Sequence, residues 1–158
     1  MLLPFFQWME ACALSVVFQS SIWLTPMVQI IHLFALTIFA GSILIVDVRL
    51  LGAVLTQIPL AKVAKDAQPW LIGSLLVLLI SGIPQLTSTA MKQYYSPFFW
   101  WKMECLLIGL VFTFTLRRKI TLAENPSSRT VWPKVTGVIS IAIWTSVATG
   151  ARLIGLLS

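Results

Sequence analysis

The chain has 158 residues, of which 58% are hydrophobic and 10% are charged, whereas about 45–50% of the residues in soluble domains are apolar. This composition excludes an ordinary soluble domain and predicts a protein embedded in lipid. The net charge of +6 does not predict a nucleic-acid partner, because membrane proteins concentrate Lys and Arg in their cytoplasmic loops.

Residues 4–19 predict an interfacial helix at the start of the chain. They mix aromatic side chains with glutamines and Glu10, and the run is too short and too polar to cross a bilayer. Aromatic side chains favour the level of the lipid headgroups, so we expect this helix to lie flat on the membrane.

The first membrane helix is expected at residues 22–52 and carries the only histidine of the chain, His32. Its uncharged stretch is long enough to span the hydrocarbon core, which needs about 20 residues at about 1.5 Å per residue. Helical geometry places Gln29 and Asp47 near the face of His32. An unpaired polar group in lipid costs several kcal/mol, so we expect His32 to face protein, a cofactor or water.

The end of this helix and the next segment carry charges. Asp47 and Arg49 point in different directions, so each is expected to reach headgroups or another helix. Residues 57–68 predict a short amphipathic helix on the membrane surface. A second membrane helix is expected at residues 69–87, with Pro69 at its start and Pro84 breaking its far end.

The third membrane helix is expected at residues 97–119. Lys102 near its start can extend toward the headgroups, whereas Glu104 is harder to place in lipid. Three basic residues, 117–119, end the helix at the other membrane surface.

A polar connection leads to the fourth membrane helix, expected at residues 132–156. Ser146 and Gly150 are small residues four positions apart, a spacing that lets a neighbouring helix approach closely. Arg152 lies near the end of this helix and has no partner close to it in the sequence.

Together these segments predict an all-α fold. We expect an integral membrane four-helix bundle with up-down-up-down topology and an N-terminal interfacial helix, in one membrane domain over residues 1–158. Basic residues concentrate in the connections at 47–69 and 116–134. By the positive-inside rule, both termini are expected outside, in the inner membrane of a bacterium.

This orientation places several ligand-type side chains near the outer face, and three interpretations of them are open. In the first, His32 is an axial ligand of haem b or a related tetrapyrrole held between helices. The carboxylates of the tetrapyrrole would lie near Arg152, Lys102 or Tyr94. The sixth ligand would be Met103, a water, or the His32 of a second copy of the chain.

In the second interpretation, His32 binds copper together with soft ligands such as Met103 and Cys105. In the third, the protein is a structural or accessory subunit without a cofactor, in a homo-oligomer or a larger membrane complex. His32 would then hydrogen-bond Glu104, a tyrosine or a backbone carbonyl. The polar groups expected within or against the membrane also include Gln29, Glu10, Asp47 and Arg49.

The sequence has no arrangement typical of a stand-alone enzyme. It lacks a Gly-rich phosphate loop, paired catalytic carboxylates and a defensible Ser-His-Asp spacing. A binding or accessory role is therefore favoured over catalysis.

Four sequence blocks carry a resemblance: FFQWMEA, HLFALTIFAGSILIVDVRLLG, QPW and YYSPFFWWKM. They resemble an uncharacterised family of small bacterial four-helix membrane proteins. More distantly, the spacing of His32, Gly41 and Arg49 and the helix from Trp101 to Arg118 are similar to membrane protoporphyrinogen oxidases and to copper-resistance D-type proteins. That similarity implies a bundle that binds haem or helps to move copper, with His32 as the one matching ligand.

Overall fold

Four helices are long and apolar enough to cross a membrane, which confirms the predicted all-α membrane fold. The computed structural model describes residues 3–122 and 131–157, so residues 123–130 of the predicted polar connection lie outside the described residues. The spanning segments are α3 (Leu24–Leu51), α4 (Leu60–Ser88), the continuous run of α6 (Pro97–Phe112), η1 (Thr113–Arg117) and α7 (Arg118–Leu122), and α8 (Trp132–Leu157).

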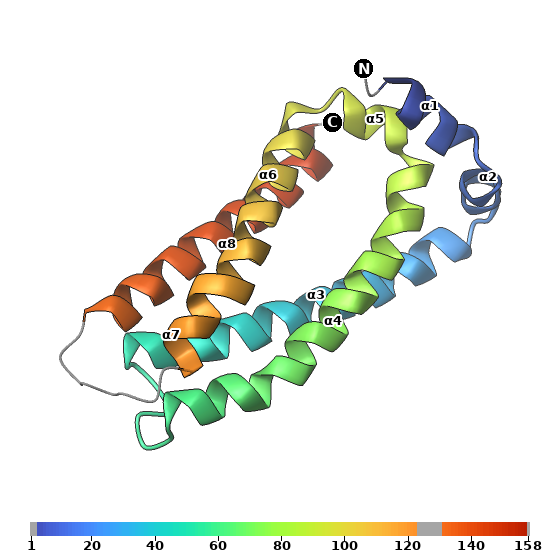
Figure 1. Cartoon of the computed structure of the whole chain (residues 1–158). Helices are drawn as coiled ribbons and strands as arrows, with labels where there is room; N and C mark the ends of the chain where they lie inside the picture. Colours follow the sequence, from blue (N-terminus) through green and yellow to red (C-terminus); the bar gives the residue numbers. More distant parts are fainter. Residues whose placement is uncertain (1–2, 123–130, 158) are drawn as a thin grey trace.

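The long helices form two pairs that meet at one end of the molecule. Successive helices run in alternating directions, and the most extensive contacts join α3 to α4 and α6 to α8 (Figure 1). The pairs are connected by contacts of α8 with α3 and of α7 with α4. Toward α5 (Ala90–Tyr94), α4 and α6 diverge (Figure 1).

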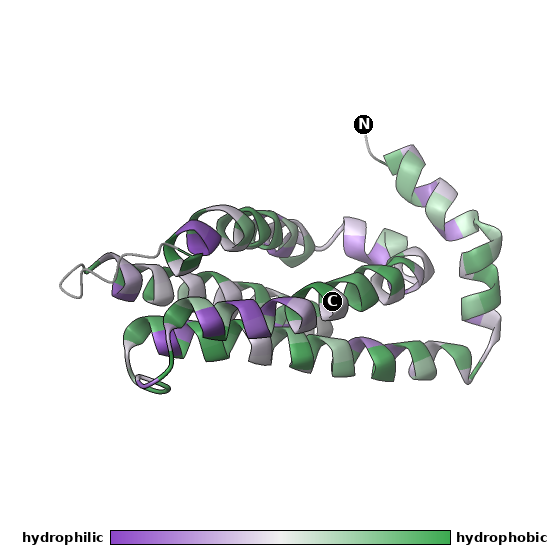
Figure 2. Ribbon diagram, turned by 60° about the horizontal axis from the view of Figure 1, so that its bottom comes forward, coloured by the Kyte–Doolittle hydropathy of each residue, from purple (hydrophilic) through white to green (hydrophobic). Residues whose placement is uncertain are grey.

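The outside of the bundle is apolar over most of its length. Large side chains such as Ile80 (70% exposed) and Phe34 (69% exposed) point outward, which is the surface that contacts lipid in a membrane protein. Figure 2 shows apolar residues along the long helices and polar residues gathered near the α3–α4 connection. The fold is therefore that of a multi-pass membrane protein.

Helix α4 differs from the prediction at both ends. It begins at Leu60 and runs through Pro69 and Pro84 to Ser88, so the separate surface helix at 57–68 is wrong. Of the two alternatives at Pro84, a break or a plain kink, the break is wrong. Each proline removes one backbone hydrogen bond from the helix. Helix α3 packs along α4, and neighbouring helices make prolines tolerable within membranes.

The N-terminal segment forms two helices instead of one. The helices α1 (Leu3–Ala11) and α2 (Ala13–Ser20) are separated at Cys12, whereas a single helix was expected at residues 4–19. Phe6 and Met9 of α1 are buried against α5 and α6. The N-terminal helices therefore cover the end of the bundle where the two pairs diverge (Figure 1).

Polar side chains of this N-terminal segment satisfy backbone groups at the end of α4. Ser15 Oγ donates a hydrogen bond to Thr87 O at 3.1 Å, and Gln19 Nε2 donates one to Ser88 O at 3.2 Å. The last carbonyls of a helix have no partner within the helix, so these bonds cap α4.

Candidate functional site

His32 hydrogen-bonds α4 through one ring nitrogen. Its Nδ1 lies 2.8 Å from Ser81 Oγ, and Ser81 Oγ lies 2.6 Å from Val77 O. A carbonyl oxygen only accepts hydrogen bonds, so a hydroxyl of Ser81 that donates to Val77 O has no proton left to donate to His32. In that arrangement Ser81 accepts the Nδ1–H of His32, and the lone pair of the imidazole is on Nε2. Within residues 3–122 and 131–157, Nε2 has no hydrogen bond.

Ser81 is a partner that the sequence reasoning missed, because Glu104, a tyrosine or a backbone carbonyl was expected. Gly82 lies beside it, and a Cβ at Gly82 would be 3.6 Å from His32 Cε1, so the ring packs against the surface of α4. The sequence did contain a signal, since Ser81 and Gly82 interrupt a continuous aliphatic run in α4. A hydroxyl and a small residue side by side make room for a polar ring from a neighbouring helix.

Lys102 of α6 is the charged group that acts on His32. Its charge acts on the imidazole, after the larger effect of burial. Lys102 is half-buried, its Nζ lies 5.8 Å from the centre of the Phe99 ring, and no described carboxylate pairs with it. His32 and Lys102 thus bring a lone pair and a cation to the region between the α3–α4 pair and α6.

The other predicted ligands do not join His32. Met103, Glu104 and Arg152 are exposed, and Cys105 is a free, half-buried thiol. Tyr94 packs instead against Phe6, with 5.2 Å between ring centres. The described residues contain no group of three or more His, Cys, Asp or Glu side chains that could hold a metal ion.

The remaining predicted polar residues have other surroundings. Gln29 is exposed, and Glu10 Oε2 accepts a hydrogen bond from the Met91 backbone N–H at 3.3 Å. Arg49 donates from Nε and Nη2 to Ile58 O, at 3.0 and 2.8 Å. It therefore holds the α3–α4 connection, and these bonds do not reach another helix.

Asp47 occupies a second polar cluster, fully buried at the end of the bundle where the helix pairs meet. Arg117 Nε donates to Asp47 Oδ1 at 2.9 Å, and Ser140 Oγ donates to Asp47 Oδ2 at 2.7 Å. Arg117 Nη2 also donates to Ile43 O at 2.8 Å. Asp47 thus reaches another helix, as one of the two predicted alternatives proposed.

Arg117 was expected to end the third helix at the membrane surface, and its side chain is buried against α3. The π-helical turn η1, which has more residues per turn than an α-helix, ends at Arg117 and orients it toward α3. Sequence periodicity assumes 3.6 residues per turn and gives no sign of such a turn.

The model of one protein family matches residues 5–157 of the chain. The chain belongs to this family of unknown function, DUF6644. No curated protein and no solved structure matches it.

The match to DUF6644 extends from α1 to α8 and confirms the resemblance to an uncharacterised family. It includes both polar clusters, the one around His32 and the one around Asp47. The chain therefore carries a lone-pair donor near one end of the bundle and a neutralised ion pair near the other.

Proposed function

We propose that this protein binds a haem-type tetrapyrrole through His32, as a redox or accessory subunit of a membrane complex. The observation that carries the proposal is the 2.8 Å hydrogen bond between His32 Nδ1 and Ser81 Oγ, which leaves Nε2 free as a ligand. Metal-binding histidines usually donate their other N–H to a fixed acceptor, because that bond sets the tautomer and the ring orientation.

The surroundings of His32 suit a flat, anionic ligand. The ring lies against Gly82, where the absence of a side chain lets the imidazole approach the surface of α4. Lys102 brings a cation without a described carboxylate partner, and the carboxylates of a tetrapyrrole would neutralise it. When bound, haem would supply one-electron chemistry, while His32 would hold the iron and Ser81 would keep the imidazole in place.

Two other functions remain as alternatives. Copper binding would use His32 with Met103 or Cys105, yet Met103 is exposed and no described contact joins either residue to His32. A structural subunit would use His32 only to pair α3 with α4 through Ser81. This role needs no free Nε2 and leaves Lys102 without a partner, so the tetrapyrrole accounts for more of the site.

The basic connections favour an inner-membrane protein of a bacterium with both chain termini outside the cytoplasm. The tetrapyrrole site would then lie in the outer half of the membrane. A second copy of the chain, or another subunit, would supply the sixth ligand.

The absorption spectrum tests the proposal. The full chain, purified in mild detergent from cells supplied with haem, is expected to show a Soret band. His32→Gln should abolish the band while keeping a side chain that can hydrogen-bond Ser81. Thr37→Val is the matched control, since Thr37 lies on the exposed side of α3 and bonds only Leu33 O of its own helix.

A colourless protein that also fails to bind added haemin would contradict the proposal. Elemental analysis of the same preparation then separates the alternatives. Copper that is retained by the full chain and lost in His32→Gln supports the metal-binding function. If neither metal nor haem is found, co-purification with another membrane complex from the native host supports the accessory role.

A further inference from the structure

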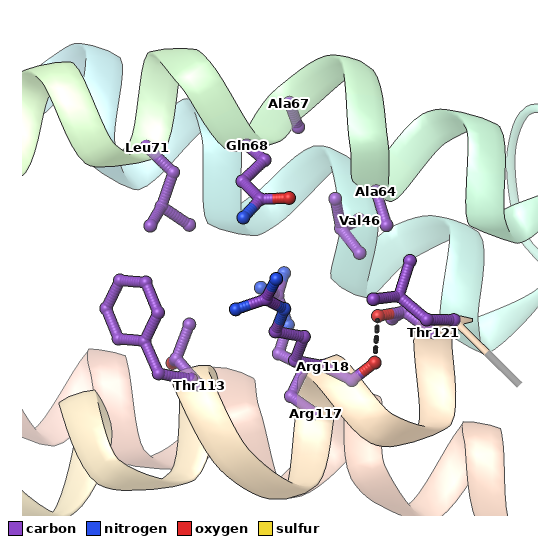
Figure 3. A pocket seen from close by; sticks show the side chains of 11 residues that line it. Val46, Ala64, Ala67, Gln68, Leu71, Thr113, Arg117, Arg118 and Thr121 are labelled. Carbon is purple, nitrogen blue, oxygen red and sulfur yellow. Dashed lines mark hydrogen bonds between the residues drawn. The ribbon is translucent and has the colours of Figure 1, made fainter.

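A small pocket lies between α4 and the run of η1 and α7, at the end of the bundle opposite to α5 (Figures 1 and 3). Its volume is about 50 Å³. One water needs about 10–15 Å³ by this kind of measure, so the pocket admits a group larger than one water. It is lined in part by Arg117, Arg118, Gln68, Thr113 and Thr121.

Arg117 brings unused hydrogen-bond donors to this pocket although it is only 5% exposed. A guanidinium has five N–H donors, and Asp47 and Ile43 O take those of Nε and one of Nη2. Nη1 has no hydrogen bond to the part of the chain that the structure describes. These N–H groups remain available, so the pocket is suited to an occupant that accepts hydrogen bonds.

Arg118 adds a charge that no described carboxylate neutralises. Arg118 and Arg117 both line the pocket, across from Gln68 of α4 (Figure 3). Asp47 balances the charge of Arg117 alone, so the pocket has an excess of one positive charge. Guanidinium groups form N–H···O bonds with anionic oxygens, so two arginines that line one pocket match the oxygen atoms of a phosphate.

The depth of the pocket indicates the source of that phosphate. Arg118 is 21 residues after Pro97, about 32 Å along a helix at about 1.5 Å per residue, and the hydrocarbon core is about 30 Å thick. Arg118 therefore lies at the level of the headgroups. Leu116 and Leu122 are 49% and 42% exposed beside it, as acyl chains next to a bound headgroup require.

We propose that this pocket binds the phosphate group of an anionic phospholipid. The proposed site lies at the end of the bundle opposite to α5, and it does not depend on any ligand of His32. Such a lipid would join α4 to α7 and so strengthen the contact between the two helix pairs.

Binding of phosphatidylglycerol to the full chain in neutral detergent tests the proposal, with native mass spectrometry or fluorescence as readout. Arg118→Gln is expected to weaken binding about tenfold, the effect of losing one charge-assisted hydrogen-bonding group. Arg118→Lys should weaken it less, because the charge remains and the planar fork is lost. Lys65→Gln is the control, since it removes an exposed charge of α4 that does not line the pocket.

Three results would overturn the proposal. The first is equal weakening by Arg118→Gln and Lys65→Gln, which would mean non-specific attraction to basic residues. The second is binding of phosphatidylcholine as tight as that of phosphatidylglycerol. The third is tighter binding of inorganic phosphate than of the lipid, which would assign the pocket to a free anion. Circular dichroism and gel filtration test whether Arg118→Gln is folded. The lipid affinity of Arg118→Lys is a second measurement of the same site.

Discussion

Asp47 and Arg117, 70 residues apart in the chain, form a buried ion pair with 2.9 Å between Oδ1 and Nε. Ser140 Oγ completes the cluster from α8, so one carboxylate is held by side chains from both helices of the second pair. This cluster lies where the α3–α4 pair meets the other helices. It joins the two halves of the bundle through polar contacts that lipid cannot replace.

Replacing Arg117 with Met is expected to destabilise the protein by about 3–5 kcal/mol, because Asp47 would keep a buried charge without a partner. The midpoint of thermal unfolding in detergent measures the effect. The double variant Asp47→Leu with Arg117→Met should recover most of the loss, since it removes both charges. If the double variant is as unstable as Arg117→Met, the stabilising effect of Arg117 does not come from the ion pair.

Ser140→Ala is expected to cost about 1–3 kcal/mol of unfolding free energy, because Asp47 Oδ2 loses its described donor. Ser146→Ala on the same helix is the control. Its hydroxyl bonds only Ala142 O of α8, so a change within about 0.5 kcal/mol is expected. Equal losses in the two variants would contradict a special role for Ser140.

Gly137→Val is expected to separate α8 from α3. A Cβ at Gly137 would lie 3.1 Å from Asp47 O and 3.3 Å from Leu50 Cβ, closer than ordinary van der Waals contact. The cost should be about 1–3 kcal/mol in thermal unfolding. Gly73→Val is the control, because nothing lies within 4 Å of a Cβ at Gly73.

Ser81→Ala tests the orientation of His32 separately from its presence. If His32 binds haem, the variant should keep the Soret band but bind haemin about 10–100-fold more weakly, because the Nδ1–H loses its acceptor. Ser74→Ala on the same helix should have no effect, since its hydroxyl bonds only Trp70 O and Leu71 O. Titration of each purified variant with haemin measures its affinity.

The two cysteines are expected to remain unpaired. Cys12, between α1 and α2, and Cys105 in α6 are both free thiols. Labelling with a maleimide in denaturing detergent should therefore be the same with and without prior reduction. More label after reduction would reveal a disulfide that this arrangement lacks.

The membrane helices could be predicted because each is a long apolar run with clear ends. The third begins at Pro97 and the fourth at Trp132, as expected from the sequence. The continuity of α4 through Pro69 and Pro84 was not predicted. Proline removes a helical hydrogen bond, and the sequence alone does not show whether a neighbouring helix makes this loss tolerable.

The candidate site could be predicted only in part. Helical periodicity placed Gln29 and Asp47 near the face of His32, and Asp47 is buried whereas Gln29 is exposed. The partner of His32 could not be predicted, because it depends on which residue of α4 lies opposite the imidazole. The burial of Arg117 depends on η1 and on a contact with Asp47, 70 residues away in the chain. Neither feature can be predicted from a single sequence.

The separation of Asp47 from Arg117 also constrains how the chain is made. A ribosome adds about 5–20 residues per second, so Asp47 is synthesised roughly 4 to 14 s before its arginine. During that interval the carboxylate must be protonated, hydrated or shielded by the insertion machinery, since hydrocarbon does not solvate a bare anion. Assembly of the bundle is thus completed only when its second half arrives, and a truncated chain would display an unneutralised acid to quality-control proteases.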